Sequence, residues 1–155
     1  YFDSELGESY VPYVVETSIG LDRMFLAVLS HSFREEELDN GESRVVLKIP
    51  AVLSPLKVAI LPLTKKDGMP KKAREIMKSL QIDFNCQYEE KDSIGKRYRR
   101  QDAIGTPICI TVDHDSLTDN SITIRDRDTM TQERIPIDQL SIMVNKKVSF
   151  KNLFS

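Results

Sequence analysis

The chain has 155 residues, of which 40% are hydrophobic and 30% are charged, as is ordinary for a globular protein. A formal net charge of −2 argues against bulk coating of nucleic acid, and no window reaches the roughly 18 apolar residues that span a bilayer. The N-terminus has neither a signal peptide nor an initiator methionine, and we expect the chain to be part of a larger protein.

The first two predicted elements are a strand and a helix. Residues 10–15 are β-branched and aromatic and predict a strand. Residues 21–33 predict a helix that is apolar on most sides. That helix either packs on the downstream domain or leaves an exposed apolar face.

Residues 34–55 predict an acidic linker and an inter-domain crossing. Asn40-Gly41 is a turn signal, and residues 44–49 alternate weakly, as in a strand. Two prolines, Pro50 and Pro55, bracket a short apolar stretch. We therefore expect three parts: a remnant of a first domain over 1–33, the linker over 34–55, and a second domain over 56–155.

The second domain predicts an α/β fold. Strands are expected over 57–63, 84–89 and 108–112, a hairpin over 121–127 and 131–135, and helices over 70–82, 93–104 and from Asp138. Strands that alternate with helices imply a largely parallel sheet, and the hairpin adds an antiparallel edge.

The segment from Glu16 to Arg23 could hold a small ammonium-bearing ligand beside a phosphate. Backbone N–H groups at a helix start bind anions, and Arg23 adds a charged donor. Gly20 permits close approach of the backbone, and the Glu16 carboxylate could accept hydrogen bonds from the ammonium group. The alternative is an ordinary helix start, with Ser18 as its cap and Arg23 as a surface charge.

Two downstream segments carry basic side chains. On the helix from Ser93, Lys96, Arg97 and Arg100 cluster away from the anchoring pair Ile94 and Tyr98, unless they form a solvated face balanced by Asp102. In the strand from Ser121, Arg125 and Arg127 share a side, which we interpret as an open sheet face for unstacked bases. The alternative there is cross-strand ion pairs with Asp126, Asp128 and Glu133.

The cysteines and histidines predict no metal site. Cys86 and Cys109 are far apart and are expected to be free thiols, and no ligand pair has the spacing of a zinc finger.

The string Glu16-Thr17-Ser18-Ile19-Gly20-Leu21-Asp22-Arg23 resembles motif 3 of class II aminoacyl-tRNA synthetases, in the glycyl-tRNA synthetase form Glu-Pro-Ser-x-Gly-Leu-x-Arg. Thr17 departs from the usual proline. The resemblance implies that Glu16, Thr17, Ser18, Ile19 and Gly20 bind glycine. It further implies that Gly20, Leu21, Asp22 and Arg23 bind ATP.

Three later strings, residues 53–63, 93–105 and 124–128, resemble the C-terminal anticodon-binding domain of the same family. That implies a three-layer domain whose five-stranded mixed sheet is flanked by helices, preceded by a strand and helix of the catalytic domain. It implies binding of the tRNA(Gly) anticodon stem-loop by Lys96, Arg97, Arg100, Arg125 and Arg127.

The parent enzyme implied by this resemblance is a cytoplasmic, homodimeric glycine–tRNA ligase that uses ATP and Mg²⁺. This chain lacks the other class II motifs, so we expect it to be inactive alone and to need no cofactor. A non-catalytic interaction or accessory module of the same fold is the main alternative. An independent nucleotide-binding domain is disfavoured, because residues 64–70 contain a single glycine.

Overall fold

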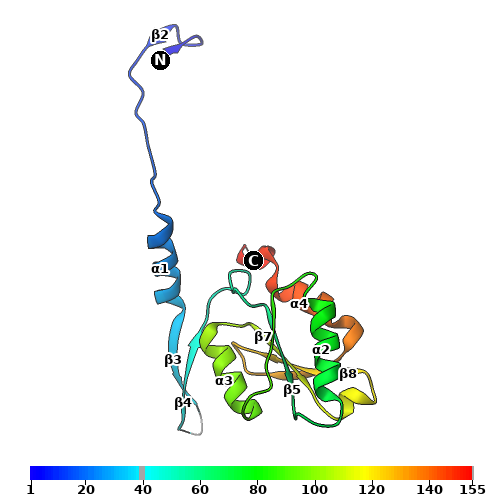
Figure 1. Ribbon diagram of the computed structural model, residues 1–155. Coiled ribbons are helices and arrows are strands. Elements are labelled where there is room, and N and C mark those ends of the chain that lie inside the picture. The colour runs from blue at the N-terminus through cyan, green and yellow to red at the C-terminus, as the bar shows by residue number, and fades with distance from the viewer. Residues whose placement is uncertain (39–40, 155) are drawn as a thin grey trace.

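The computed structural model describes residues 1–38 and 41–154. They form an α/β body, from which an N-terminal arm projects (Figure 1). In the described part of the chain, no helix is long and apolar enough to cross a membrane.

The arm begins with a small hairpin of β1 (Phe2–Asp3) and β2 (Glu8–Ser9). The predicted strand over residues 10–15 is wrong, because this stretch is extended and unpaired and Tyr13 is fully exposed. A strand needs a partner for its backbone groups, and the arm offers none there. Helix α1 (Leu21–Ser32) forms as predicted but leaves its apolar residues Met24, Phe25 and Leu26 in solvent.

The predicted linker is largely a second hairpin. Strands β3 (Phe33–Glu37) and β4 (Ser43–Leu47) pair in antiparallel register, with Phe33 opposite Leu47. The weak alternation of residues 44–49 did indicate β4. Of the predicted Asn40-Gly41 turn, Asn40 lies outside the described residues, whereas Gly41 has a φ of 79°.

The body contains the predicted five-stranded mixed sheet, in the order β6-β5-β7-β8-β9. In the first crossover, β5 (Val58–Pro62) is followed by α2 (Met69–Leu80) and then by β6 (Cys86–Tyr88). In the second crossover, β6 is followed by α3 (Ile94–Ile104) and then by β7 (Ile108–Val112). Strand β5 is therefore parallel to both of its neighbours, β6 and β7. Strands β8 (Ser121–Asp126) and β9 (Gln132–Pro136) add the antiparallel edge, and α4 (Leu140–Val148) follows. Short 3-10 turns η1 (Asp115–Leu117), η2 (Ile137–Gln139) and η3 (Phe150–Leu153) complete the body.

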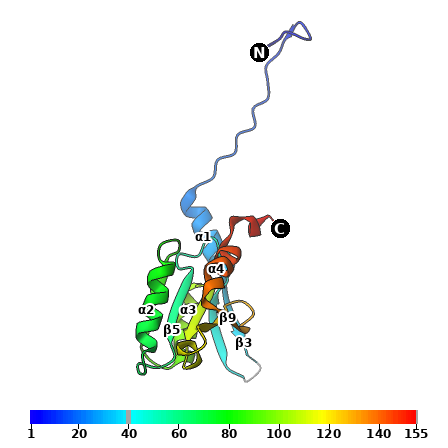
Figure 2. The same ribbon diagram turned by 90° about the vertical axis from the view of Figure 1, so that its right-hand side faces the viewer.

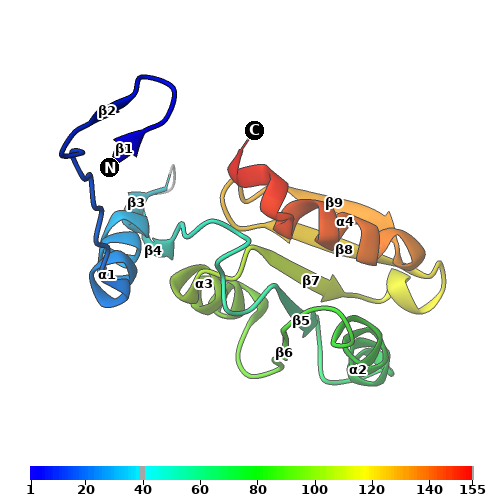
Figure 3. The same cartoon turned by 90° about the horizontal axis from the view of Figure 1, so that it is seen from above.

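The sheet lies between two layers of helices, as the predicted three-layer fold requires (Figure 2). On one face, α2 and α4 cover an aliphatic core drawn from β5, β7, β8 and β9, which includes Ile60, Ile110 and Ile122. On the other face, Ile94 and Tyr98 of α3 pack on Ala59, Leu61 and Cys109. Helix α3 in turn lies between the sheet and the β3–β4 hairpin (Figure 3).

Candidate nucleic-acid interface

The structure corrects the predicted cationic surface, because Arg97, Arg125 and Arg127 are buried. Their exposed fractions are 2%, 6% and 3%. Buried guanidinium groups need fixed acceptors, and all three find them inside the protein. They are therefore not free donors on an open face.

Arg97 ties together the carboxyl ends of two parallel strands. Its Nη1 donates to the carbonyl oxygens of Pro62, at 2.7 Å, and Glu89, at 3.2 Å, and its Nη2 donates to that of Leu63. Burial lowers the pKa of Arg97. The predicted face formed by Ile94 and Tyr98 is correct, but Arg97 belongs to the inner side of α3 and not to its cationic side.

Arg125 lies under α3 and not on an open sheet face. It is the cross-strand partner of Cys109, and its guanidinium binds Asp102 of α3 through two hydrogen bonds of 2.7 and 2.9 Å. The Tyr98 ring stacks against it at 4.8 Å. Burial opposes the charge, yet the bonds to Asp102 raise the pKa of Arg125. Arg127 donates from Nη1 to the Gly105 carbonyl and pairs with Asp128, one of the predicted ion-pair partners.

Lys96 and Arg100 remain on the surface, close to the start of α3. Lys96 is exposed, as is Lys91 in the loop after β6. Arg100 is about two-fifths exposed and pairs with Asp92, at 2.9 Å, and with Glu89. A hydrogen bond to Glu89 raises the pKa of Arg100, and a hydrogen bond from Arg100 lowers that of Asp92. Arg100 is therefore held in place after the carboxyl end of β6, and Lys91 and Lys96 are exposed in the same part of the chain.

A polar part of the sheet surface was missed by the sequence reasoning. Gln132 pairs with Arg125 and Arg134 pairs with Thr123, so these residues of β8 and β9 share the α3 face of the sheet. Gln132 and Arg134 are exposed and Thr123 is half-buried. The period of two puts Gln132 and Arg134 on one side of β9, and the register of the hairpin makes this the side of Thr123 and Arg125.

Arg134 is held by carboxylates from the loop after β7. Its Nη1 donates to Asp113 at 2.7 Å, and Asp119 lies 3.2 Å from Nη2. Burial acts to raise the pKa of Asp113, but hydrogen bonds from Arg134 and Ser116 lower it to about 2. We define Thr123, Gln132 and Arg134 as the open sheet patch.

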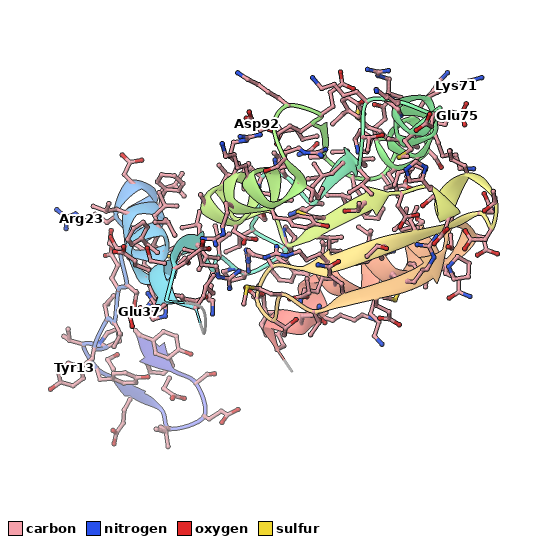
Figure 4. All side chains as sticks on the ribbon, turned by 90° about the horizontal axis from the view of Figure 1, so that it is seen from below. Tyr13, Arg23, Glu37, Lys71, Glu75 and Asp92 are labelled. Carbon is pink, nitrogen blue, oxygen red and sulfur yellow. The ribbon has the colours of Figure 1, made fainter. Side chains whose placement is uncertain are left out.

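The segment from Glu16 to Arg23 forms no pocket within the described residues. Residues 16–20 are extended and exposed, and Gly20 rather than Ser18 occupies the cap position of α1. Tyr13 and Arg23 point away from the body (Figure 4). Glu16, Ser18 and Arg23 are neighbours in sequence. Within the described residues, no other element packs against them to complete a binding site.

The thiols are free, as predicted. Burial raises the pKa of Cys86 to about 11 and that of Cys109 to about 12. Over residues 1–38 and 41–154, no group of three His, Cys, Asp or Glu side chains could hold a metal ion.

Comparisons with known proteins place this geometry among tRNA synthetases. The model of the anticodon binding domain family matches residues 57–147. The glycine–tRNA ligase of Clostridium tetani is 53% identical over 150 residues, covering 97% of this chain and 32% of that protein. That of Borrelia hermsii is 49% identical over 148 residues, covering 96% and 33%. The chain thus spans about a third of the length of these curated relatives.

A solved structure has a similar fold. It is the RNA binding domain of threonyl-tRNA synthetase from Cryptosporidium parvum Iowa II, with a TM-score of 0.59 and 22% sequence identity. The similarity covers 64% of this chain and 25% of that one.

Proposed function

This chain belongs to the family of anticodon binding domains, and we propose that it holds the anticodon stem-loop of a glycine-accepting tRNA. The observation that carries the proposal is the open sheet patch on β8 and β9, together with surface cations beyond β6 at the opposite edge of the same sheet. Unstacked RNA bases are read by hydrogen bonds to their edges, and cations elsewhere on the surface contact the phosphates. The names of the relatives favour tRNA(Gly) over other tRNAs.

In this proposal the surface residues divide into two roles. Lys91, Lys96 and Arg100 contact phosphates, since they are exposed near one end of the sheet. Thr123, Gln132 and Arg134 face the bases, because they present donors and acceptors from adjacent strands.

The predicted contacts of Arg97, Arg125 and Arg127 become indirect. These three arginines position the strand ends, α3 and the β8–β9 turn from inside the protein. Each guanidinium is already hydrogen-bonded to protein oxygens, so each acts on RNA through the backbone and side chains that it fixes.

For the whole protein we propose a glycine–tRNA ligase that works as a homodimer in the cytoplasm. The residue types at Glu16 to Gly20 suit glycine, because a carboxylate and a hydroxyl complement an ammonium group. Gly20 to Arg23 suit ATP, since Arg23 lies in the first turn of a helix, where phosphates bind well. Mg²⁺ would accompany ATP by binding its phosphates.

Fluorescence anisotropy with a labelled tRNA(Gly) anticodon stem-loop tests the proposal. We expect weak binding that falls as salt rises and that exceeds binding to an unrelated stem-loop of equal length. Equal affinity for both stem-loops would remove base reading. No binding to either at low salt would instead favour the interaction module.

A further inference from the structure

We propose that Arg44 is a positioning residue that fixes the direction in which α1 leaves the anticodon-binding body. Arg44 lies in β4, within the predicted linker, and its side chain is 1% exposed. The positional claim stands on the geometry alone. Its relevance to tRNA charging rests on the proposed function.

Helix α1 has no hinge where it joins the hairpin. The helix ends at Ser32 and β3 begins at Phe33, so no residue lies between the two elements. The Phe33 N–H donates to the Leu29 carbonyl, and the Lys48 N–H donates to the Ser32 carbonyl at 2.7 Å. Helix and strand follow one another along a nearly straight course (Figure 1). The orientation of the hairpin therefore sets the orientation of α1.

Arg44 binds one acceptor group within the hairpin and two in the body. Its Nε and Nη2 donate to Glu36 of β3 at 2.9 and 2.6 Å. Its Nη1 donates to Asp102 of α3 and to the Arg127 carbonyl, both at 3.0 Å. A single guanidinium thus links β3, α3 and the residue that follows β8.

The link ends on β8, the strand that carries Thr123 of the open sheet patch. Asp102 is fully buried and also binds Arg125 of β8. Arg44, Asp102 and Arg125 therefore form a continuous buried triad from hairpin to sheet. Such a triad specifies geometry more than it adds stability, because buried charges lose most of their Coulombic gain to desolvation.

Two further close approaches between α3 and the hairpin support the same arrangement. Arg99 donates from Nη1 to the Ser43 carbonyl at 2.6 Å. At the C-terminal end of the helix, a Cβ on Gly105 would lie 3.0 Å from the Leu47 carbonyl oxygen, and Gly105 has a φ of 83°. The hairpin is therefore held close along α3, with Arg44 as its buried attachment.

Because α1 is rigid, this attachment acts at a distance. Twelve helical residues form a rod of about 18 Å, and the segment from Glu16 to Arg23 joins the far end of that rod. Arg44 thus sets where this segment lies relative to the open sheet patch.

Double electron–electron resonance on the whole chain tests the inference. Spin labels are attached at Ala27→Cys on α1 and Glu75→Cys on α2, in a Cys86→Ser, Cys109→Ala background. Both labelled positions are exposed, and Glu75 is visible on the outer side of α2 (Figure 4). We expect one narrow distance distribution, which Arg44→Met broadens at least twofold. The methionine keeps the aliphatic bulk but removes every donor of Arg44.

The matched control is Arg34→Met, which removes an exposed arginine of the same hairpin that donates to the neighbouring Phe33 carbonyl and should leave the distribution narrow. Circular dichroism checks folding; if Arg44→Met is unfolded, Glu36→Gln should give a smaller broadening. A distribution that is already broad in the parent chain, or unchanged in folded Arg44→Met, would overturn the inference. Stem-loop binding is measured on the same samples, so a failure of the proposed function is seen separately from a failure of positioning.

Discussion

Asp102 holds Arg125 with both carboxylate oxygens, Oδ1 at 2.7 Å from Nη1 and Oδ2 at 2.9 Å from Nη2. The pair joins the middle of the sheet to the helix above it, and Arg44 binds the same carboxylate. One acid therefore neutralises part of two buried cations. Arg125, which the sequence suggested as an RNA ligand, is instead a structural support beneath the proposed RNA-binding surface.

Asp102→Asn should destabilise the chain by about 3 to 5 kcal/mol, because it leaves Arg44 and Arg125 in the interior without that carboxylate. Urea denaturation followed by circular dichroism measures the loss. The control is Asp92→Asn, which breaks an exposed pair with Arg100 and should change the urea midpoint little. A loss below about 1 kcal/mol for Asp102→Asn would show that the buried network is not needed for stability.

Replacing Lys96 or Arg100 with alanine should weaken the binding of every stem-loop to a similar degree. A phosphate contact carries no sequence information, and its loss should reduce the salt slope by about one. Anisotropy titrations at several salt concentrations provide the slope. Lys78→Ala, at an exposed site on α2, is the control and should leave the salt slope unchanged. A slope that does not change in either variant would place the phosphates elsewhere.

Gln132→Ala should reduce discrimination between stem-loops more than it reduces affinity for them. A side-chain amide can form paired hydrogen bonds to a base edge, worth about 1 to 3 kcal/mol of discrimination. The measurement is the ratio of Kd values for the tRNA(Gly) stem-loop and an unrelated one. Gln139→Ala, in η2, is the matched control. If both Kd values rise in proportion, Gln132 does not read a base.

Asp113→Asn should remove a pH-dependent part of the stability. The pKa of Asp113 is lowered from 3.8 to about 2 in the folded chain, so its ion pair stabilises above pH 4 and is lost as the pH falls from 4 to 2. The contribution is at most about 2 kcal/mol. Urea midpoints between pH 2 and 6 should therefore fall less steeply in the variant. Identical slopes would contradict the role of Arg134 as its partner.

The chain alone should show no glycine-dependent exchange between ATP and pyrophosphate. Glu16 and Arg23 lie on an exposed arm that no other described element faces, so neither ligand would be enclosed. Exchange is measured with radiolabelled pyrophosphate, and a glycine-omitted reaction gives the background. Activity above that background would contradict the expectation.

The regular elements of the body could be predicted because their sequence patterns are local. The stripe of Ala73, Ile76 and Leu80 gave α2, and the alternation of Ile108, Ile110 and Val112 gave β7. The arm was predicted less well. Its apolar helix formed, but the sequence did not specify a partner for residues 10–15.

Whether the arginines are buried or exposed depends on contacts between residues that are distant in sequence. Arg44 meets Asp102 across 58 positions and Arg125 meets it across 23, and no periodicity encodes such pairs. The single acid among the bases of α3 was a visible signal. Asp102 was considered only as the balance of a solvated basic face, whereas it is the buried partner of Arg44 and Arg125, which was not predicted.

The direct junction between α1 and β3 leaves no tolerance for a change of length. One residue added between Ser32 and Phe33 would either rotate the helix by about 100° or slip β3 by one position. A slipped β3 would turn Glu36 away from Arg44, and a rotated α1 would point Arg23 in a new direction. A point substitution within α1 should therefore be far better tolerated than a single insertion at the end of this helix.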